Sequence, residues 1–103
     1  MDRERLNTAK ELQFERLTID GVVCQGPAVL FNADLVGAAG GASTAIVFDG
    51  NSTAGRVMIN LAAVTSTADR APYNQGLFFP RGIYVDVGAN VTSVSFLFIP
   101  IKE

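Results

Sequence analysis

The sequence contains no histidine and no tryptophan, and it has a single cysteine, Cys24, among its 103 residues. Histidine is the commonest general base and the commonest metal ligand, so its absence removes the usual proton-transfer group and most zinc sites. Neither a Ser–His nor a Cys–His nucleophilic pair can be assembled. A lone cysteine after Val22-Val23 is typical of a small buried residue and cannot close an internal disulfide. We therefore expect a protein that is not an enzyme and holds no cofactor.

The carboxylates beyond the N-terminal segment have the sequence surroundings of turn and surface residues. Asp20 and Asp49 each precede a glycine, as turn residues do, and Asp86 falls on the polar side of an alternating segment. A facing carboxylate pair, as in a glycosidase, stays open because it depends on the fold. Asp49-Gly50-Asn51 resembles the start of a calcium loop, but an EF-hand needs a glutamate at its twelfth position, where Asn60 stands. We expect no metal site.

Charge is also scarce. Charged residues make up 17% of the chain and the net charge is -2, whereas soluble domains average about 25% charged residues. No cluster of Lys and Arg exists beyond the mixed-sign N-terminus, so we expect no nucleic-acid partner. No apolar run approaches the roughly 20 residues that span a bilayer, and Met1–Arg5 is charged with no apolar signal segment behind it. We expect no membrane partner and synthesis in a cytosol.

Hydrophobic residues make up 49% of the chain, which is long enough for one domain or for one domain and an arm. A domain of this size buries roughly two-thirds of its unfolded surface, so its core is thin. A thin core uses few apolar residues. The surplus is therefore expected on the outside, where partner chains cover it.

The composition changes near residue 17. Residues 1–16 hold eight charged residues, close to half of the chain's total, and no Gly or Pro. Too few apolar positions exist there to hold an isolated helix down. We expect residues 1–16 to form an arm, with one or two turns of helix as the alternative, and residues 17–103 to form the β domain.

Beyond residue 17, short apolar runs alternate with turns rich in Gly, Pro, Asn and Asp. Residues 43–48 and 56–64 predict a hairpin across the turn-rich residues 49–55. Residues 65–74 are polar and contain Pro72, so we expect a long connection there, with a short strand within it as the alternative. Six to eight short strands at close spacing predict an all-β fold, either an antiparallel β-sandwich or a jelly-roll-like barrel.

The last strand, residues 91–99, is apolar on both faces in its second half. Phe96 and Phe98 share one face, and Leu97 and Ile99 share the other. A strand in a one-core sandwich needs a single apolar face. Either a loop or the arm covers the second face, or that face is an intersubunit contact. The residues expected to contact partner chains are Leu6, Leu12, Phe14, Phe78, Phe79, Leu97 and Ile99.

Residues 46–55 (IVFDGNSTAG) lead from an apolar strand through Asp-Gly and a Ser/Thr-rich turn to Gly and a further strand. Together with residues 82–88 before the final Val/Thr/Phe-rich strand, and residues 21–23 before Gly26-Pro27, they resemble small tailed-bacteriophage virion proteins. The resemblance covers roughly residues 17–99. It implies a β-sandwich that decorates a capsid or forms another repeated part of the virion, without catalysis or cofactor.

The leading expectation is a capsid decoration (cement) protein, a homotrimer over capsomer junctions that stabilises the phage head by intersubunit packing. Its partners would be the major capsid protein or other virion proteins, and its location the virion. A neck, tail or fibre component is the first alternative. A carbohydrate-binding module is the second, although the absence of tryptophan weakens it.

Overall fold

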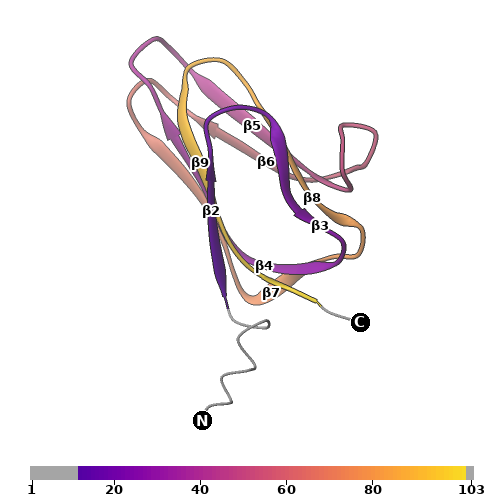
Figure 1. Ribbon diagram of the computed structural model, residues 1–103. Coiled ribbons are helices and arrows are strands. Elements are labelled where there is room, and N and C mark those ends of the chain that lie inside the picture. Colours follow the sequence, from indigo (N-terminus) through magenta and orange to yellow (C-terminus); the bar gives the residue numbers. More distant parts are fainter. Residues whose placement is uncertain (1–11, 102–103) are drawn as a thin grey trace.

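The computed structural model describes residues 12–101, which form eight strands and no helix (Figure 1). None of these residues forms a helix long and apolar enough to cross a membrane. The strands, labelled as in Figure 1, are β2 (Gln13–Leu17), β3 (Gly21–Gln25), β4 (Ala28–Gly37), β5 (Ser43–Asp49), β6 (Arg56–Ala63), β7 (Ala68–Phe79), β8 (Gly82–Val87) and β9 (Val91–Pro100).

The strands form two four-stranded antiparallel sheets that pack face to face. The first sheet has the order β2-β9-β4-β7 and the second has the order β3-β8-β5-β6. The pairs are nested along the chain, β2 with β9, β3 with β8, β4 with β7 and β5 with β6. A long hairpin folded over on itself in this way is a jelly roll. The expected all-β antiparallel sandwich is therefore confirmed, with the jelly-roll order of strands.

The core lies between the two sheets because alternate residues of each strand point inward. In β9 the inward residues are Val94, Phe96 and Phe98, and in β8 they are Ile83 and Val85. Leu30 and Leu35 of β4 meet them from the same sheet as β9. The alternation seen in the sequence of these strands is thus produced by burial of one face.

A β-bulge at Phe31 changes the phase of β4. Leu30 pairs with Phe98 and Asn32 with Leu97, so Phe31 has no partner of its own on β9. Ala28 and Leu30 point inward before the bulge, and Ala33 and Leu35 point inward after it. The extra residue lets β4 keep apolar side chains in the core along its whole length.

Residues 65–74 are predicted to be a long connection with at most a short strand, but from Ala68 onward they belong to the 12-residue strand β7. Strand β7 begins at Ala68 and runs to Phe79, with Pro72 paired to Asn32 of β4. Proline has no N–H to donate, but β7 is an edge strand of the first sheet and needs hydrogen bonds on one side only. Its polar composition reflects exposure of its other side.

The sheet also begins before the expected boundary at residue 17. Residues 13–16 were assigned to the arm, yet they belong to β2, in which Phe14 pairs with Leu97 of β9. The side chains of all four residues are exposed. No alternation of buried and exposed residues therefore marks residues 13–16 in the sequence. The strand is defined by its pairing to β9, and Leu17 at its end packs against the core. Residues 1–11 lie outside the described part.

Candidate protein-binding surface

The outer face of the first sheet carries an apolar surface made by cross-strand pairs. Paired residues in an antiparallel ladder point to the same side of the sheet. Phe14 pairs with Leu97, while Val29 pairs with both Ile99 and Phe78. Because Phe96 and Phe98 point into the core, these five residues point outward. We name Phe14, Val29, Phe78, Leu97 and Ile99 the apolar face.

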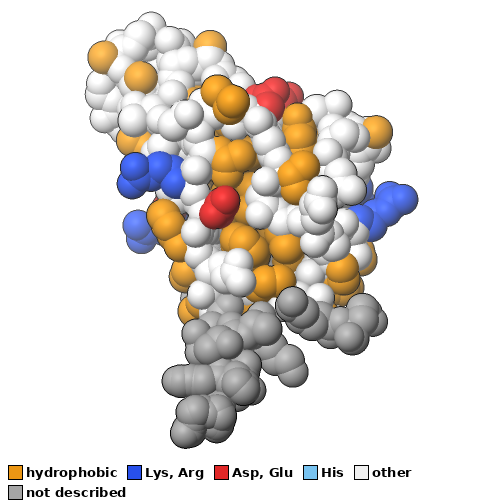
Figure 2. All heavy atoms as spheres, in the orientation of Figure 1, with side chains coloured by type: hydrophobic (Ala, Val, Ile, Leu, Met, Phe, Trp, Pro, Cys, Tyr) orange, Lys and Arg blue, Asp and Glu red, His pale blue; other side chains and the backbone are white. Residues whose placement is uncertain are grey.

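The two aromatic members of the apolar face are largely in water. Phe14 is 59% exposed and Phe78 is 52% exposed, while the three aliphatic members are half-buried. Leu12 is also exposed, directly before β2. Figure 2 looks onto the edge of the sandwich where β2 and β3 lie, and hydrophobic side chains are also visible there between the two strands. Contiguous exposed apolar surface of this kind marks an interaction site more often than scattered single residues do.

Most of the contact residues expected from the sequence lie on this face. Phe14, Phe78, Leu97 and Ile99 are brought together by three different strands. Phe79 is a correction, because it is 0% exposed and belongs to the core. Neighbouring residues of a strand point to opposite faces, so Phe78 and Phe79 cannot both lie outside. Leu6 lies outside the described residues.

Val29 is not among the contact residues predicted from the sequence. It sits inside the continuous apolar run of residues 28–31, which hides the difference between inward and outward positions. Its place on the apolar face follows only from its pairing with Ile99 and Phe78. Gly76 adjoins it, because a Cβ built on Gly76 would clash with Val29 Cγ1. Glycine at this point of β7 therefore leaves room for the valine.

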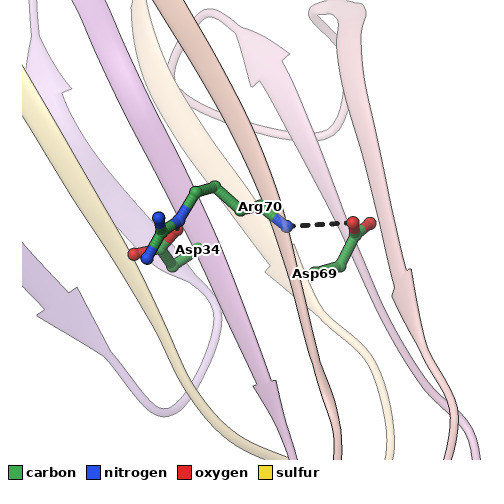
Figure 3. Close-up of polar contacts among 3 residues, drawn as sticks. All are labelled: Asp34, Asp69 and Arg70. Atoms are coloured by element: carbon green, nitrogen blue, oxygen red, sulfur yellow. Dashed lines mark hydrogen bonds and ion pairs between the residues drawn. The ribbon is translucent and has the colours of Figure 1, made fainter.

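The other half of the same outer face is polar. Arg16 pairs with Ser95, Ser95 with Asp34, and Asp34 with Arg70, one row across the whole sheet. Arg70 Nε donates to Asp34 Oδ1 at 2.9 Å. Figure 3 shows the Arg70 side chain reaching over to Asp34 while its backbone nitrogen points to Asp69. An exposed pair adds little stability, and such charges mainly fix the orientation of a partner.

The aspartates serve the backbone of the fold. Asp20 Oδ1 accepts from the Val87 amide (2.7 Å), and Asp49 Oδ1 accepts from the Arg81 amide (2.8 Å). Asp69 Oδ2 accepts from the Ala62 amide (3.0 Å), which ties edge strand β7 to edge strand β6 of the other sheet. Within residues 12–101 no three Cys, Asp or Glu side chains gather in a metal-binding group.

The single thiol has no sign of activation. Cys24 is half-buried, and burial raises the pKa of its thiol. The thiolate is the nucleophilic form of cysteine, so a raised pKa lowers reactivity at neutral pH. Cys24 is therefore a packing residue at the edge of the core, which agrees with its apolar sequence surroundings.

No protein-family model, curated protein or solved structure matches the chain. The resemblance of its turn and strand motifs to virion proteins therefore stays a prediction.

Proposed function

We propose that this protein is a structural subunit of a virion, a capsid decoration protein that stabilises the phage head by packing its apolar face against other chains. The observation that carries the proposal is the apolar face itself, with Phe14 and Phe78 both more than half exposed. Two water-exposed phenylalanines on one sheet face are unfavourable in an isolated monomer, whereas an assembly protein buries such side chains against its partners.

The energetics suit a protein present in many copies. Burial of a phenylalanine side chain contributes about 1.5–3 kcal/mol. Two such side chains and three aliphatic neighbours give one modest contact, and repetition of that contact over a shell multiplies its effect. The polar row containing Arg16 and Asp34 fixes the orientation of the partner at little cost in stability.

The fold supports the same class of function by analogy. Jelly rolls build many viral capsid domains, although a fold alone does not define a function. We propose the major capsid protein or other virion proteins as partners and a homotrimer as the assembled state. A neck, tail or fibre position is the alternative, and the copy number per particle separates them, because decoration requires hundreds of copies.

The first test is the solution mass, by light-scattering chromatography, of the full chain and of the double variant Phe14→Ser/Phe78→Ser. Ile19→Ser/Val57→Ser is the matched control, because it removes two exposed hydrophobic side chains elsewhere. A trimer lost only in the Phe variant assigns the face to self-association. If the full chain and both variants are monomers, the apolar face does not mediate self-association in solution, and its proposed partners are the other proteins of the particle. A trimer unchanged in the Phe variant contradicts a role of this face in self-association.

A carbohydrate-binding module is the second candidate. Jelly rolls also form lectin domains, and Phe14 lies beside the polar row, so an exposed ring adjoins hydrogen-bonding groups as in many sugar sites. A glycan array probed with the full chain decides this. Binding that disappears in Phe14→Ser would replace the virion proposal, and an array without hits would remove this candidate.

A further inference from the structure

A polar hollow lies at the end of the molecule where the β5–β6 loop meets the β7–β8 turn. Its volume is about 240 Å³. The Gly50 amide donates to Gly82 O at 3.0 Å and joins the two turns behind it. None of the apolar-face residues lines the hollow. The lining residues are Asp49, Gly50, Asn51, Ser52, Ala54, Gly55 and Arg81.

Asp49 is the buried charge of this hollow. It is only 6% exposed, and Oδ1 accepts the Arg81 amide at 2.8 Å. Oδ2 receives no hydrogen bond from any residue between 12 and 101. An ionised carboxylate has about four acceptor sites, and burial of a charge is costly unless it is compensated. The arrangement therefore leaves an acceptor oxygen that a positively charged ligand would stabilise.

Further oxygens converge beside Gly82. The point at which a Cβ of Gly82 would lie is 2.8 Å from Cys24 O, 3.1 Å from Gly50 O and 3.1 Å from Asn51 Oδ1. Two of these oxygens belong to residues that also line the hollow. Gly82 has φ +142, a conformation that other residues rarely adopt, so glycine permits the turn and allows these oxygens to approach its backbone closely.

We propose that this hollow binds a small hard cation, of which Ca²⁺ is the best match, through Asp49 and the neutral oxygens of the β5–β6 loop. Ca²⁺ prefers six to eight oxygen ligands from carboxylates, amides, backbone carbonyls and waters. The residues that line the hollow include one carboxylate (Asp49), one side-chain amide (Asn51) and one hydroxyl (Ser52), and they include no Cys or His for a softer metal. The inference is independent of the proposed virion function.

A site with one carboxylate is weak, and we expect a Kd of about 10⁻⁴–10⁻³ M, the range of low-affinity calcium modules. This arrangement differs from an EF-hand, which requires a glutamate at the twelfth position of one loop. Here the carboxylate Asp49 stands at the start of the β5–β6 loop, and the neutral oxygens come from the residues that follow it. Position 60, where Asn60 stands, is on strand β6 and is not part of the hollow.

Arg81 is expected to affect cation binding in the opposite direction to Asp49. Its backbone amide holds Asp49, and its exposed side chain lines the hollow. A positive guanidinium there weakens cation binding, so Arg81→Gln should tighten it. If Arg81 instead supplies the counter-charge of Asp49, then Arg81→Gln destabilises the fold and no cation binds.

The experiment is an NMR titration of the EDTA-treated full chain with CaCl₂, with MgCl₂ as the competing probe. We expect saturable shifts of the Gly50, Gly55 and Gly82 amides. Asp49→Asn keeps an acceptor for the Arg81 amide and should weaken binding at least about tenfold, because it removes the one carboxylate among the described residues that line the hollow. Asp34→Asn and Thr53→Ala are the controls, since they alter a carboxylate and a loop residue outside the hollow.

Two results would overturn the proposal. One is the absence of saturable shifts up to about 10 mM Ca²⁺, well above the expected Kd. The other is binding that is equally strong in Asp49→Asn. Asn51 is exposed, so Asn51→Ala tests the same site even if Asp49→Asn does not fold. A folded Asn51→Ala protein should bind Ca²⁺ more weakly than the original chain, and unchanged affinity would also contradict the site.

Discussion

The outer faces of the two sheets both carry apolar side chains that include phenylalanine, but the phenylalanine rings differ in how far they are exposed to water. On the second sheet Phe48 of β5 pairs with Tyr84 and with Val57, and Tyr84 pairs with Val22. Phe48 is only 7% exposed, and its ring lies 6.3 Å from that of Tyr84 at an interplanar angle of 55°. On the first sheet, Phe14 and Phe78 stay more than half exposed.

Position in the sheet explains the difference. Phe48 lies on β5, a central strand with neighbours on both sides, and its own sheet covers it. Phe14 lies on β2 and Phe78 on β7, the two edge strands of the first sheet, so each has covering side chains on one side only. The same residue type is therefore an internal packing element on one sheet and an available contact on the other.

The largest expected effect separates two neighbouring residues of β7. Phe79→Ala should lower the free energy of unfolding by about 3–5 kcal/mol, because it empties a fully buried position. Phe78→Ala should change it by no more than about 0.5 kcal/mol, because its ring is half in water. Urea denaturation of both variants measures this, and equal losses would mean that Phe78 is part of the core.

The next effect tests the outer face of the second sheet. Phe48→Ala should cost about 2 kcal/mol, since it removes a buried ring and its tilted contact with Tyr84. Phe14→Ala, on the other outer face, should cost much less. Thermal unfolding of the two variants compares them. If Phe48→Ala lost as little stability as Phe14→Ala, the Phe48 ring would not be a packing element of the second sheet.

Asp69→Ala should cost about 1 kcal/mol. It removes the acceptor of the Ala62 amide and so loosens the contact between edge strands β6 and β7. Amide hydrogen exchange at Ala62 gives a local readout and should become faster. Unchanged protection of this amide would contradict the bridging role of Asp69.

The smallest effect belongs to the polar half of the first sheet. Asp34→Asn should change stability by no more than about 0.5 kcal/mol, because Arg70 in this ion pair is largely exposed. Guanidinium denaturation, in which high ionic strength screens exposed charges, is the less sensitive method, so urea is preferred. A loss above about 1 kcal/mol would mean that this pair supports the sheet.

The sequence was sufficient for the fold class and for the strands with strong alternation. The hairpin of residues 43–48 and 56–64 is present as β5 and β6, and the inward side chains of β9 are Val94, Phe96 and Phe98. These predictions succeed because burial of one face imposes a period of two on the sequence.

The features that could not be predicted from the sequence depend on pairing between segments that are far apart in the chain. Strand β2 shows no alternation of buried and exposed residues over residues 13–16, so its pairing with β9 cannot be seen in the sequence. Pro72 argues against a strand in the sequence, yet proline is tolerated in β7 because β7 lies at the edge of the sheet. Val29 joins the apolar face only through β9 and β7. The adjacent rings of Phe78 and Phe79 look alike in the sequence, but the pleat of β7 turns Phe79 into the core and Phe78 outward.

The most direct test of the central claim is co-sedimentation with phage heads that lack this protein. The account predicts saturable binding of the full chain, and loss of that binding by at least about tenfold in Phe14→Ser/Phe78→Ser, because apolar burial on the face is removed. The control Ile19→Ser/Val57→Ser should bind normally. Equal binding of the Phe variant and the original chain would contradict the claim that the apolar face holds this protein to its partners.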